Sequence, residues 1–345
     1  MLYGHGDDGY QYSREIVADF STNVWWGGEP AGLKEQVFGN WKSINRYPEV
    51  LAESFLEEVA AFHDLSPGQV LICNGTAEAI YLIAQAFRSS CTAITVPTFA
   101  EYEDACCLHR HNLTFVDWQT LKQPNVEPDW TGSELFFLCN PNNPTGDVLS
   151  VDRMEDLLRR HPQTVFVIDE AYIGFTEATG SAVGLLSEFS NLILLRSLTK
   201  TFAIPGLRLG YVLASETLIG RLCHFKYPWS VNSLAVEAGK FILRHYATIQ
   251  PPLRDLLWEK QAFAANMAQL EGFQVGESHT HYFLVQMCGQ SAAELKRFLI
   301  DRYGILIRDA GNFRGLSPGH FRVATLSSEK NQWLIQALAE WIRIR

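Results

Sequence analysis

The chain lacks a long hydrophobic run: none of its 345 residues belongs to an apolar stretch of the roughly 18–20 residues that a membrane-spanning helix needs. It also lacks a basic excess, because 38 acidic residues outnumber 28 lysines and arginines and give a net charge of −10. This balance argues against a general surface for nucleic acid or membrane, and leaves room for a local basic pocket that binds a small anion. The first residues contain neither a basic segment nor an apolar core, so we expect no signal peptide and a cytoplasmic location.

Cysteine is scarce. There are seven cysteines, an odd number, and no two of them have the CxxC spacing. This pattern predicts a reduced intracellular protein without a disulfide framework. His109 and His111 could be a pair of metal ligands, but no further ligands follow at a zinc-like spacing, so we predict no metal site. Internal repeats and low-complexity segments are absent as well.

The sequence does contain an alternation of helical patterns with short apolar runs. Several runs are continuous rather than alternating, which predicts strands buried on both faces of a mainly parallel sheet. Helical patterns such as residues 151–160 lie between them and would cover the sheet. The predicted strands of this sheet are residues 70–73, 93–96, 113–116, 135–139, 165–168, 192–195 and 209–213.

The pattern changes after residues 227–229, where two long helices are predicted at 233–246 and 253–270. We therefore predict an α/β fold with two domains: a large domain at 30–228, and a smaller α+β domain formed by 1–29 with 229–345. A ligand cleft is expected where the strands of the large sheet end and the small domain closes over them. The small domain is predicted to contain strands at 273–275, 282–286, 305–308 and 321–324, and helices at 291–303 and 329–343.

The most informative segment is residues 197–210, which places Lys200 soon after the apolar run 192–195. A lysine at the end of a buried strand is unfavourable unless it has a task. Burial favours its neutral form, and a neutral amine is a nucleophile. The alternative is a lysine whose ammonium group extends to water. Arg208 follows eight residues later and adds a second cation to the segment.

Three further segments place polar residues next to predicted strands. In residues 74–78, Gly75 would let the backbone approach a ligand, and the free amides of a helix start would suit a phosphate, although such residues also cap ordinary helices. Residues 140–146 follow a buried strand and indicate either a functional loop or a turn. Asp169 ends another strand and needs a partner there, or caps the next helix, and Tyr172 could reach the same ligand.

In this order, the segments resemble fold-type I pyridoxal-5′-phosphate (PLP) transferases of the class I/II aminotransferase family, over nearly the whole chain. The resemblance implies PLP as cofactor and a catalytic set of Lys200, Asp169 and Tyr172. Lys200 would bind the cofactor covalently, and Asp169 would pair with the pyridinium nitrogen. Asn143 and Tyr172 would hydrogen-bond the ring O3′, while Phe99 would stack on the ring. The remaining implied cofactor-binding residues, most of them around the cofactor phosphate, are Gly75, Thr76, Ala77, Ser197, Thr199 and Arg208.

The resemblance also implies a homodimer with shared active sites, because Tyr47 matches a tyrosine that reaches the cofactor phosphate of the neighbouring subunit. Residues 45–48 and 305–309 resemble the branch that contains histidinol-phosphate aminotransferase and L-threonine O-3-phosphate decarboxylase, whose substrates carry a phosphate monoester. Arg322 matches the arginine that clamps the substrate α-carboxylate. Arg308 would bind the substrate phosphate, or else would be a surface arginine on an edge strand.

The N-terminal segment favours the decarboxylase. Residues 4–8 and 17–23 resemble its start, in which a His-Gly pair and an asparagine contact the substrate, although residues 24–28 depart from the usual Asn-Pro-x-Gly. We expect PLP-dependent decarboxylation of L-threonine O-3-phosphate to (R)-1-amino-2-propanol O-2-phosphate, a cobalamin precursor. The alternative is histidinol-phosphate aminotransferase or another aminotransferase. The implied substrate-binding residues are His5, Gly6, Asn23, Asn143, Arg308 and Arg322.

Overall fold

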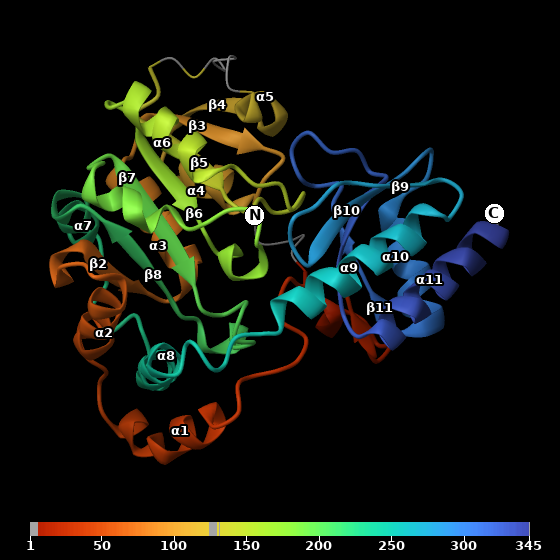
Figure 1. The fold of residues 1–345 in the computed structure, drawn as a ribbon, viewed down its shortest axis with the longest axis horizontal. Helices are drawn as coiled ribbons and strands as arrows, with labels where there is room; N and C mark the ends of the chain where they lie inside the picture. Colours follow the sequence, from red (N-terminus) through yellow and green to blue (C-terminus); the bar gives the residue numbers. More distant parts are fainter. Residues whose placement is uncertain (1–5, 124–129, 131, 345) are drawn as a thin grey trace.

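A seven-stranded sheet forms the centre of the larger part of the molecule in the computed structural model, which describes residues 6–123, 130 and 132–344 (Figure 1). The strand order is β2-β8-β7-β6-β5-β3-β4, and only β8 runs against the others. Each predicted run forms one of these strands, which confirms the mainly parallel sheet. The strands are β2 (Val70–Cys73), β3 (Cys91–Val96), β4 (Asn112–Asp117), β5 (Leu135–Cys139), β6 (Val165–Asp169), β7 (Leu192–Ser197) and β8 (Gly210–Ala214).

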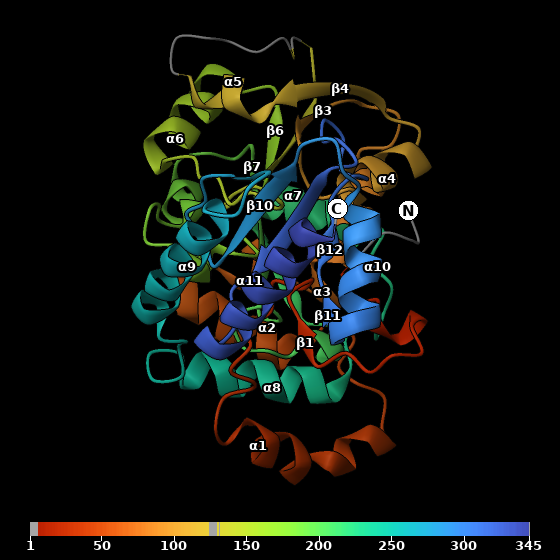
Figure 2. The same cartoon turned by 90° about the vertical axis from the view of Figure 1, so that its right-hand side faces the viewer.

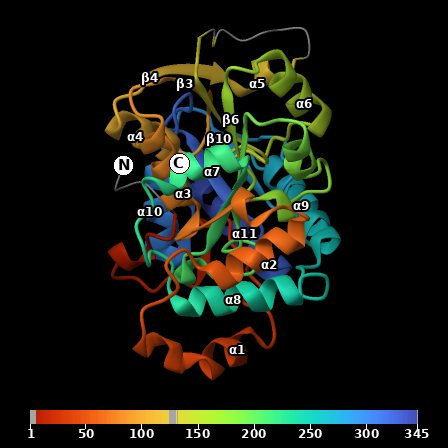
Figure 3. The same cartoon turned by 90° about the vertical axis from the view of Figure 1, so that its left-hand side faces the viewer.

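Helices cover both faces of this sheet. Alternate residues along each strand face opposite sides, so in β5 Phe136 and Leu138 join one core cluster and Leu135 and Phe137 join the other. The edge strand β4 differs, because most of its residues are partly or fully exposed. One face is covered by α2 (Glu53–His63), α6 (Val151–Arg160) and α8 (Ser233–Arg244), with α2 and α8 in front in Figure 3. The other face packs against α3 (Gly75–Ala86), α4 (Glu101–Leu108) and α7 (Glu216–Cys223).

A smaller antiparallel sheet, ordered β12-β13-β10-β9, lies beside the large one and carries three long helices (Figure 2). The N-terminal segment returns to this part of the molecule, since β1 pairs with β11 in a two-stranded parallel sheet. The predicted domain boundaries at residues 30 and 228 stay a prediction. The elements are β1 (Ala18–Asp19), β9 (Phe273–Val275), β10 (Tyr282–Met287), β11 (Ile305–Leu306), β12 (Arg308–Asp309), β13 (His320–Ala324), α9 (Leu253–Ala268), α10 (Ala292–Tyr303) and α11 (Ser328–Arg343).

The prediction of one strand over residues 305–308 is wrong. The chain changes partner at Ile307: β11 pairs with β1, whereas β12 pairs with β13. The break allows one short segment to join two sheets. In the second pairing, Arg308 lies directly opposite Arg322. The register of a short strand pair therefore brings two distant arginines together.

Two helices lie at the margin of the large sheet. Helix α5 (Trp118–Lys122) follows β4, and α1 (Leu33–Gly39) lies beyond α8 (Figure 1), with Leu33 buried in the core cluster that includes residues of α8. All seven cysteines are free thiols. Within the described residues, no helix combines the length and the apolar character that crossing a membrane requires.

Candidate active site

Two adjoining cavities lie at the ends of strands β5, β6 and β7. The inner cavity has a volume of about 120 Å³, and the outer cavity has a volume of about 400 Å³. They share five lining residues: Phe99, Asn143, Tyr172, Lys200 and Arg208. Because strand ends and the small sheet meet here, the cleft lies where the sequence predicts it.

The inner cavity brings together every residue predicted to bind the cofactor, with the exception of Tyr47. The tyrosine has an 83% exposed side chain, and its ring centroid lies 5.1 Å from that of Trp229. The predicted residues that line the inner cavity are Gly75, Thr76, Ala77, Phe99, Asn143, Asp169, Tyr172, Ser197, Thr199, Lys200 and Arg208.

One end of the inner cavity is the N-terminus of α3, where Gly75 has a φ of 76°. A Cβ atom at this position would lie 2.6 Å from Nη2 of Arg208, so only glycine allows the guanidinium to approach the helix start. Arg208 is held in turn by a 3.0 Å hydrogen bond from Nη1 to the carbonyl of Pro205. A helix N-terminus next to a guanidinium is an arrangement that suits a phosphate.

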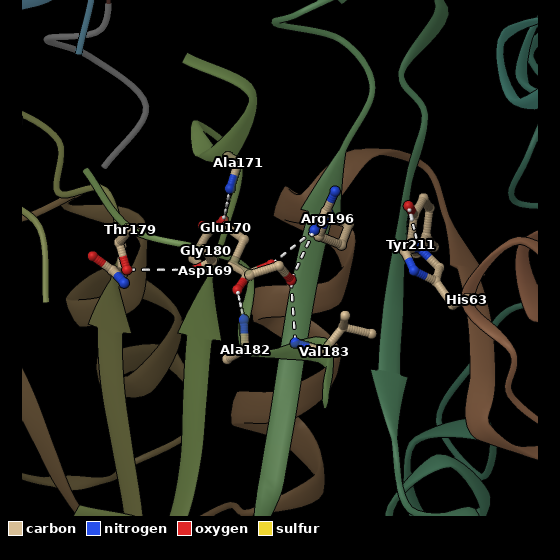
Figure 4. Close-up of polar contacts among 12 residues, drawn as sticks. His63, Asp169, Glu170, Ala171, Thr179, Gly180, Ala182, Val183, Arg196 and Tyr211 are labelled. Carbon is tan, nitrogen blue, oxygen red and sulfur yellow. Dashed lines mark hydrogen bonds and ion pairs between the residues drawn. The ribbon is translucent and has the colours of Figure 1, made fainter. Parts of the chain in front are cut away.

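The opposite end of the cavity carries the carboxylate of Asp169 at the end of β6. Oδ1 accepts from the amide of Ala171 at 3.0 Å, and Oδ2 accepts from the hydroxyl of Tyr102 at 2.8 Å. Its neighbour Glu170 points to the other side of the strand, where it is ion-paired with Arg196 at 2.9 Å (Figure 4). Successive residues of a strand face opposite sides, so only the first carboxylate reaches the cavity.

Asp169 is well suited to a cationic ligand. Burial raises the pKa of its carboxyl to about 6, while the hydrogen bond from Tyr102 opposes that rise. A cationic ring nitrogen in the inner cavity would stabilise the ionised form. The cavity therefore offers a carboxylate and a helix start that suits a phosphate, an arrangement that fits PLP.

Lys200 lies between the two cavities, in the turn after β7. Burial lowers the pKa of its amine to about 8, and the cations Arg208 and Arg322 act in the same direction. The main-chain carbonyl of Lys200 accepts a hydrogen bond from the amide of Trp25 at 2.9 Å. Trp25 belongs to residues 24–28, the segment that departs from the usual Asn-Pro-x-Gly. Lys200 lines both cavities, which argues against the alternative of a lysine that extends from the surface to bulk water.

We expect Lys200→Met to stabilise the cofactor-free protein. Below pH 8 the folded state must hold an ammonium ion that burial disfavours, so wild-type stability rises as the pH increases from about 8 towards 10.5. The variant should gain roughly 2 kcal/mol of unfolding free energy at pH 7, and this gain should shrink over that window. Urea denaturation of both proteins at pH 7 and pH 10 measures the difference. An equal difference at the two pH values would contradict a depressed lysine pKa.

The outer cavity contains the two arginines of the small sheet. Arg308 is 6% exposed and Arg322 is 5% exposed, so Arg308 is not the surface arginine of the alternative interpretation. Arg322 donates from Nη2 to the carbonyl of Ser21 at 2.5 Å and from Nη1 to Oδ1 of Asn143. Arg308 donates from Nη2 to Oδ1 of Asn312 at 2.9 Å. These bonds orient both guanidinium groups beside the same cavity.

The N-terminal segment closes one side of the outer cavity. A Cβ atom at Gly6 would lie 2.4 Å from the carbonyl oxygen of Ser21, which explains why a glycine is needed there. The segment is held by a 2.8 Å bond from the amide of Asp7 to Oγ of Ser21, and by the 2.6 Å ion pair of Asp8 with Lys296. The predicted substrate residues that line this cavity are Gly6, Asn23, Asn143, Arg308 and Arg322, whereas His5 lies outside the described residues.

Sequence reasoning missed three residues that hold the site together. The Tyr102 hydroxyl donates a hydrogen bond to Asp169. The carbonyl of Ser21 accepts one from Arg322, and the side chain of Asn312 accepts one from Arg308. The position of Tyr102, three residues after Phe99, is a signal for the first of them. The contact of Ser21 with Arg322 joins residues 301 positions apart, so no local pattern indicates it. Asn312 lies only four residues after Arg308, but the sequence does not show that the side chains meet.

Comparisons with known proteins agree with this geometry. A family model described as aminotransferase class I and II matches residues 17–338. The chain is 31% identical over 334 residues to threonine-phosphate decarboxylase of Salmonella typhimurium, covering 94% of this chain and 91% of that protein. It is 32% identical over 326 residues to histidinol-phosphate aminotransferase of Caldanaerobacter subterraneus subsp. tengcongensis, covering 90% of both.

Solved structures lead to the same family. The crystal structure of L-threonine-O-3-phosphate decarboxylase from Porphyromonas gingivalis is similar with a TM-score of 0.91 and 37% sequence identity. The similarity covers 95% of this chain and 100% of that chain. The predicted fold class is thus confirmed. The chain belongs to the class I and II aminotransferase family, whose members are fold-type I pyridoxal-phosphate enzymes.

Proposed function

We propose that this protein decarboxylates L-threonine O-3-phosphate to (R)-1-amino-2-propanol O-2-phosphate. The observation that carries the proposal is the pair Arg308 and Arg322, two buried guanidinium groups directly opposite each other on β12 and β13. Like charges in this relation repel each other unless an anion lies between or beside them. Threonine phosphate carries two anionic groups, a carboxylate and a phosphate, and can satisfy both arginines at once.

PLP, when bound, supplies an electron sink that allows a bond to the substrate α-carbon to break. Asp169 would hold its ring nitrogen, Arg208 and the start of α3 would hold its phosphate, and Lys200 would hold its carbonyl carbon. Arg322 would orient the substrate carboxylate with bidentate geometry, and Arg308 would bind the substrate phosphate. The amine of Lys200, with its lowered pKa, is the group in this cavity that can carry a proton to or from the α-carbon.

Incubation of the PLP-loaded enzyme with threonine phosphate tests the proposal. We expect this first assay to release CO₂. In a second assay, with histidinol phosphate and 2-oxoglutarate, we expect no glutamate to form. Histidinol phosphate has a phosphate but no carboxylate, so it would leave one of the two arginines without an anionic partner. Glutamate formation in the second assay, with no CO₂ in the first, would reverse the assignment in favour of the aminotransferase.

That aminotransferase is the second candidate, and a specific finding favours it. Relatives of both kinds match this chain at 31% and 32% identity over nearly its whole length. Both reactions use the same lysine, the same carboxylate and an arginine for a substrate carboxylate. The N-terminal resemblance and the paired arginines support the decarboxylase.

We also propose that the enzyme is a homodimer with shared active sites. Large apolar side chains are exposed in residues 26–50, which include α1, and at Trp229. An apolar groove of about 430 Å³ runs between α1 and residues 203–207, and Pro205 and Gly206 line both this groove and the outer cavity. A second copy on this face would therefore lie next to the substrate. The exposed side chains are Trp26, Phe38, Trp41, Ile44, Tyr47, Val50 and Trp229.

Sedimentation velocity is expected to give about twice the chain mass of 38.9 kDa. Phe38→Glu places a charge among the exposed apolar groups and should shift the protein towards the monomer, with at least a tenfold weaker association. Trp258→Glu is the matched control, because this tryptophan is 70% exposed on α9, outside the groove. A dimer that is weakened equally by both substitutions, or by neither, would contradict an interface at α1.

A further inference from the structure

Tyr102 lines the inner cavity beside the carboxylate of Asp169. It belongs to the first turn of α4, its side chain is fully buried, and its hydroxyl donates to Oδ2 of Asp169 at 2.8 Å. Its ring is held from two sides: it is nearly parallel to Phe137, with centroids 5.2 Å apart, and edge-on to Phe99 at 5.7 Å. This packing leaves the phenol little freedom to turn away from the carboxylate.

We propose that Tyr102 is a positioning residue for Asp169, and that its hydrogen bond keeps the carboxylate ionised and aimed at the cofactor ring nitrogen. The inference rests on the proposed assignment of Asp169 to that nitrogen. It goes further by assigning a role to a residue that lines the inner cavity and acts on Asp169 through a hydrogen bond. Tyr102 would thereby contribute to cofactor affinity through the carboxylate of Asp169.

The hydrogen bonds of Asp169 support this role. Two protein groups donate to its carboxylate, the Tyr102 hydroxyl and the amide of Ala171, one on each oxygen. Both donors hold the group in one orientation, and their bonds to an ionised acceptor are stronger than bonds to a neutral one. The phenol remains a donor over a wide pH range, because burial and the neighbouring carboxylate raise the pKa of Tyr102 well above its ordinary value.

The other titratable groups around Asp169 do not replace this bond. Burial raises the pKa of the Cys139 thiol, which therefore stays neutral, and its Sγ donates to the carbonyl of Pro141 at 3.2 Å. Glu170 is paired with Arg196 on the other side of β6. Tyr172 faces the cavity as a neutral phenol, since burial raises its pKa as well.

Lys200 is the cation that faces Asp169, and it favours the ionised carboxyl together with Tyr102. Of these two groups, Lys200 is engaged by the cofactor when PLP is bound. The tyrosine hydroxyl then remains the side-chain donor that stabilises the carboxylate. Removing this hydroxyl should consequently weaken the pairing of Asp169 with a cationic ring nitrogen.

Tyr102→Phe tests the inference with the smallest possible change. We expect the dissociation constant for PLP, measured by titrating the cofactor-free protein at pH 7.5, to rise by about tenfold. Tyr211→Phe is the matched control: this tyrosine is also buried, on β8, and its hydroxyl is hydrogen-bonded to His63 at 2.9 Å, away from Asp169. Both variants lose a buried hydroxyl and should lose similar stability, whereas only Tyr102→Phe should lose affinity.

The pH dependence of PLP binding separates positioning from a general structural effect. Because the Tyr102 bond lowers the pKa of Asp169, its loss should raise that pKa, and the carboxyl of the variant should become protonated at a higher pH. The acidic limb of the binding profile should therefore move to higher pH in Tyr102→Phe and stay in place in Tyr211→Phe. The increase in melting temperature on adding PLP should also become smaller in Tyr102→Phe alone.

A double-mutant cycle completes the test. In an Asp169→Asn background, Tyr102→Phe should have no further effect on PLP affinity. Equal affinities and equal acidic limbs for the two tyrosine variants would overturn the role of Tyr102. If Asp169→Asn itself binds PLP as well as the wild type does, the assignment of Asp169 fails, which is a different outcome from the failure of Tyr102.

Discussion

Replacing Lys200 by alanine is expected to remove the visible absorption band of the lysine-bound cofactor and to reduce turnover by about 10³-fold or more. Proton transfer by a positioned side chain typically contributes 10²–10⁴-fold to a rate, and Lys200 would also supply the covalent bond to PLP. The purified wild-type protein should be yellow. Absorption spectra and CO₂ release from threonine phosphate, measured on the same preparations, check both parts of this expectation.

Lys260→Met is the matched control for this experiment. Lys260 is also a buried lysine with a lowered pKa, but its ammonium donates to the carbonyl of Ser278 and does not line either cavity. This variant should keep the absorption band and most of the activity, although its stability should fall. A wild-type protein without the band after incubation with PLP would argue against Lys200 as the cofactor lysine.

Arg308→Gln is expected to lower kcat/KM for threonine phosphate by about 10²–10³-fold. Removing one partner of a buried, charge-assisted pair commonly costs about 2–5 kcal/mol, and Arg308 would be the buried partner of the substrate phosphate. The loss should be much smaller with unphosphorylated L-threonine, because that substrate cannot use the guanidinium. The ratio of the two kcat/KM values therefore measures phosphate recognition directly.

Arg302→Gln controls for the removal of a positive charge from the same domain. Arg302 forms a surface ion pair with Glu340 and is half-exposed, so its loss should change kcat/KM less than twofold. Arg322→Gln should behave differently from both, since it would weaken the binding of every α-carboxylate and break the contact with Ser21. If Arg308→Gln lowers activity equally with the two substrates, the arginine does not recognise phosphate.

Much of the fold could be predicted because most strands of the large sheet correspond to short runs of apolar residues in the sequence. The run at residues 135–139 is apolar throughout, and the strand β5 has those bounds with all of its residues buried. Helix α6 likewise matches its predicted range, with an apolar stripe facing the sheet and its charged residues outside. The break between β11 and β12 could not be predicted, because the four apolar and basic residues at 305–308 show no turn signal.

The candidate site likewise contains residues that the sequence could predict and residues that it could not. Its chemistry is carried by short segments that begin where strands end, and parallel strands bring their carboxyl ends to one edge of a sheet. For this reason, motifs around Gly75, Asn143, Asp169 and Lys200, taken together as a family resemblance, predicted most of the lining of the inner cavity. Tyr102 was missed because its function depends on a hydrogen bond across 67 residues of sequence.

The sequence by itself determined the strands and core of the large sheet, because these depend on spacing within a few residues, and the order of its motifs carried the family resemblance that identified the residues around Lys200. Only the tertiary structure decided that Arg308 lies opposite Arg322, that Tyr102 supports Asp169, and that the N-terminal segment closes the outer cavity. These contacts join segments far apart in the chain. Their geometry is set by strand register and by packing between the two sheets, which no local pattern encodes.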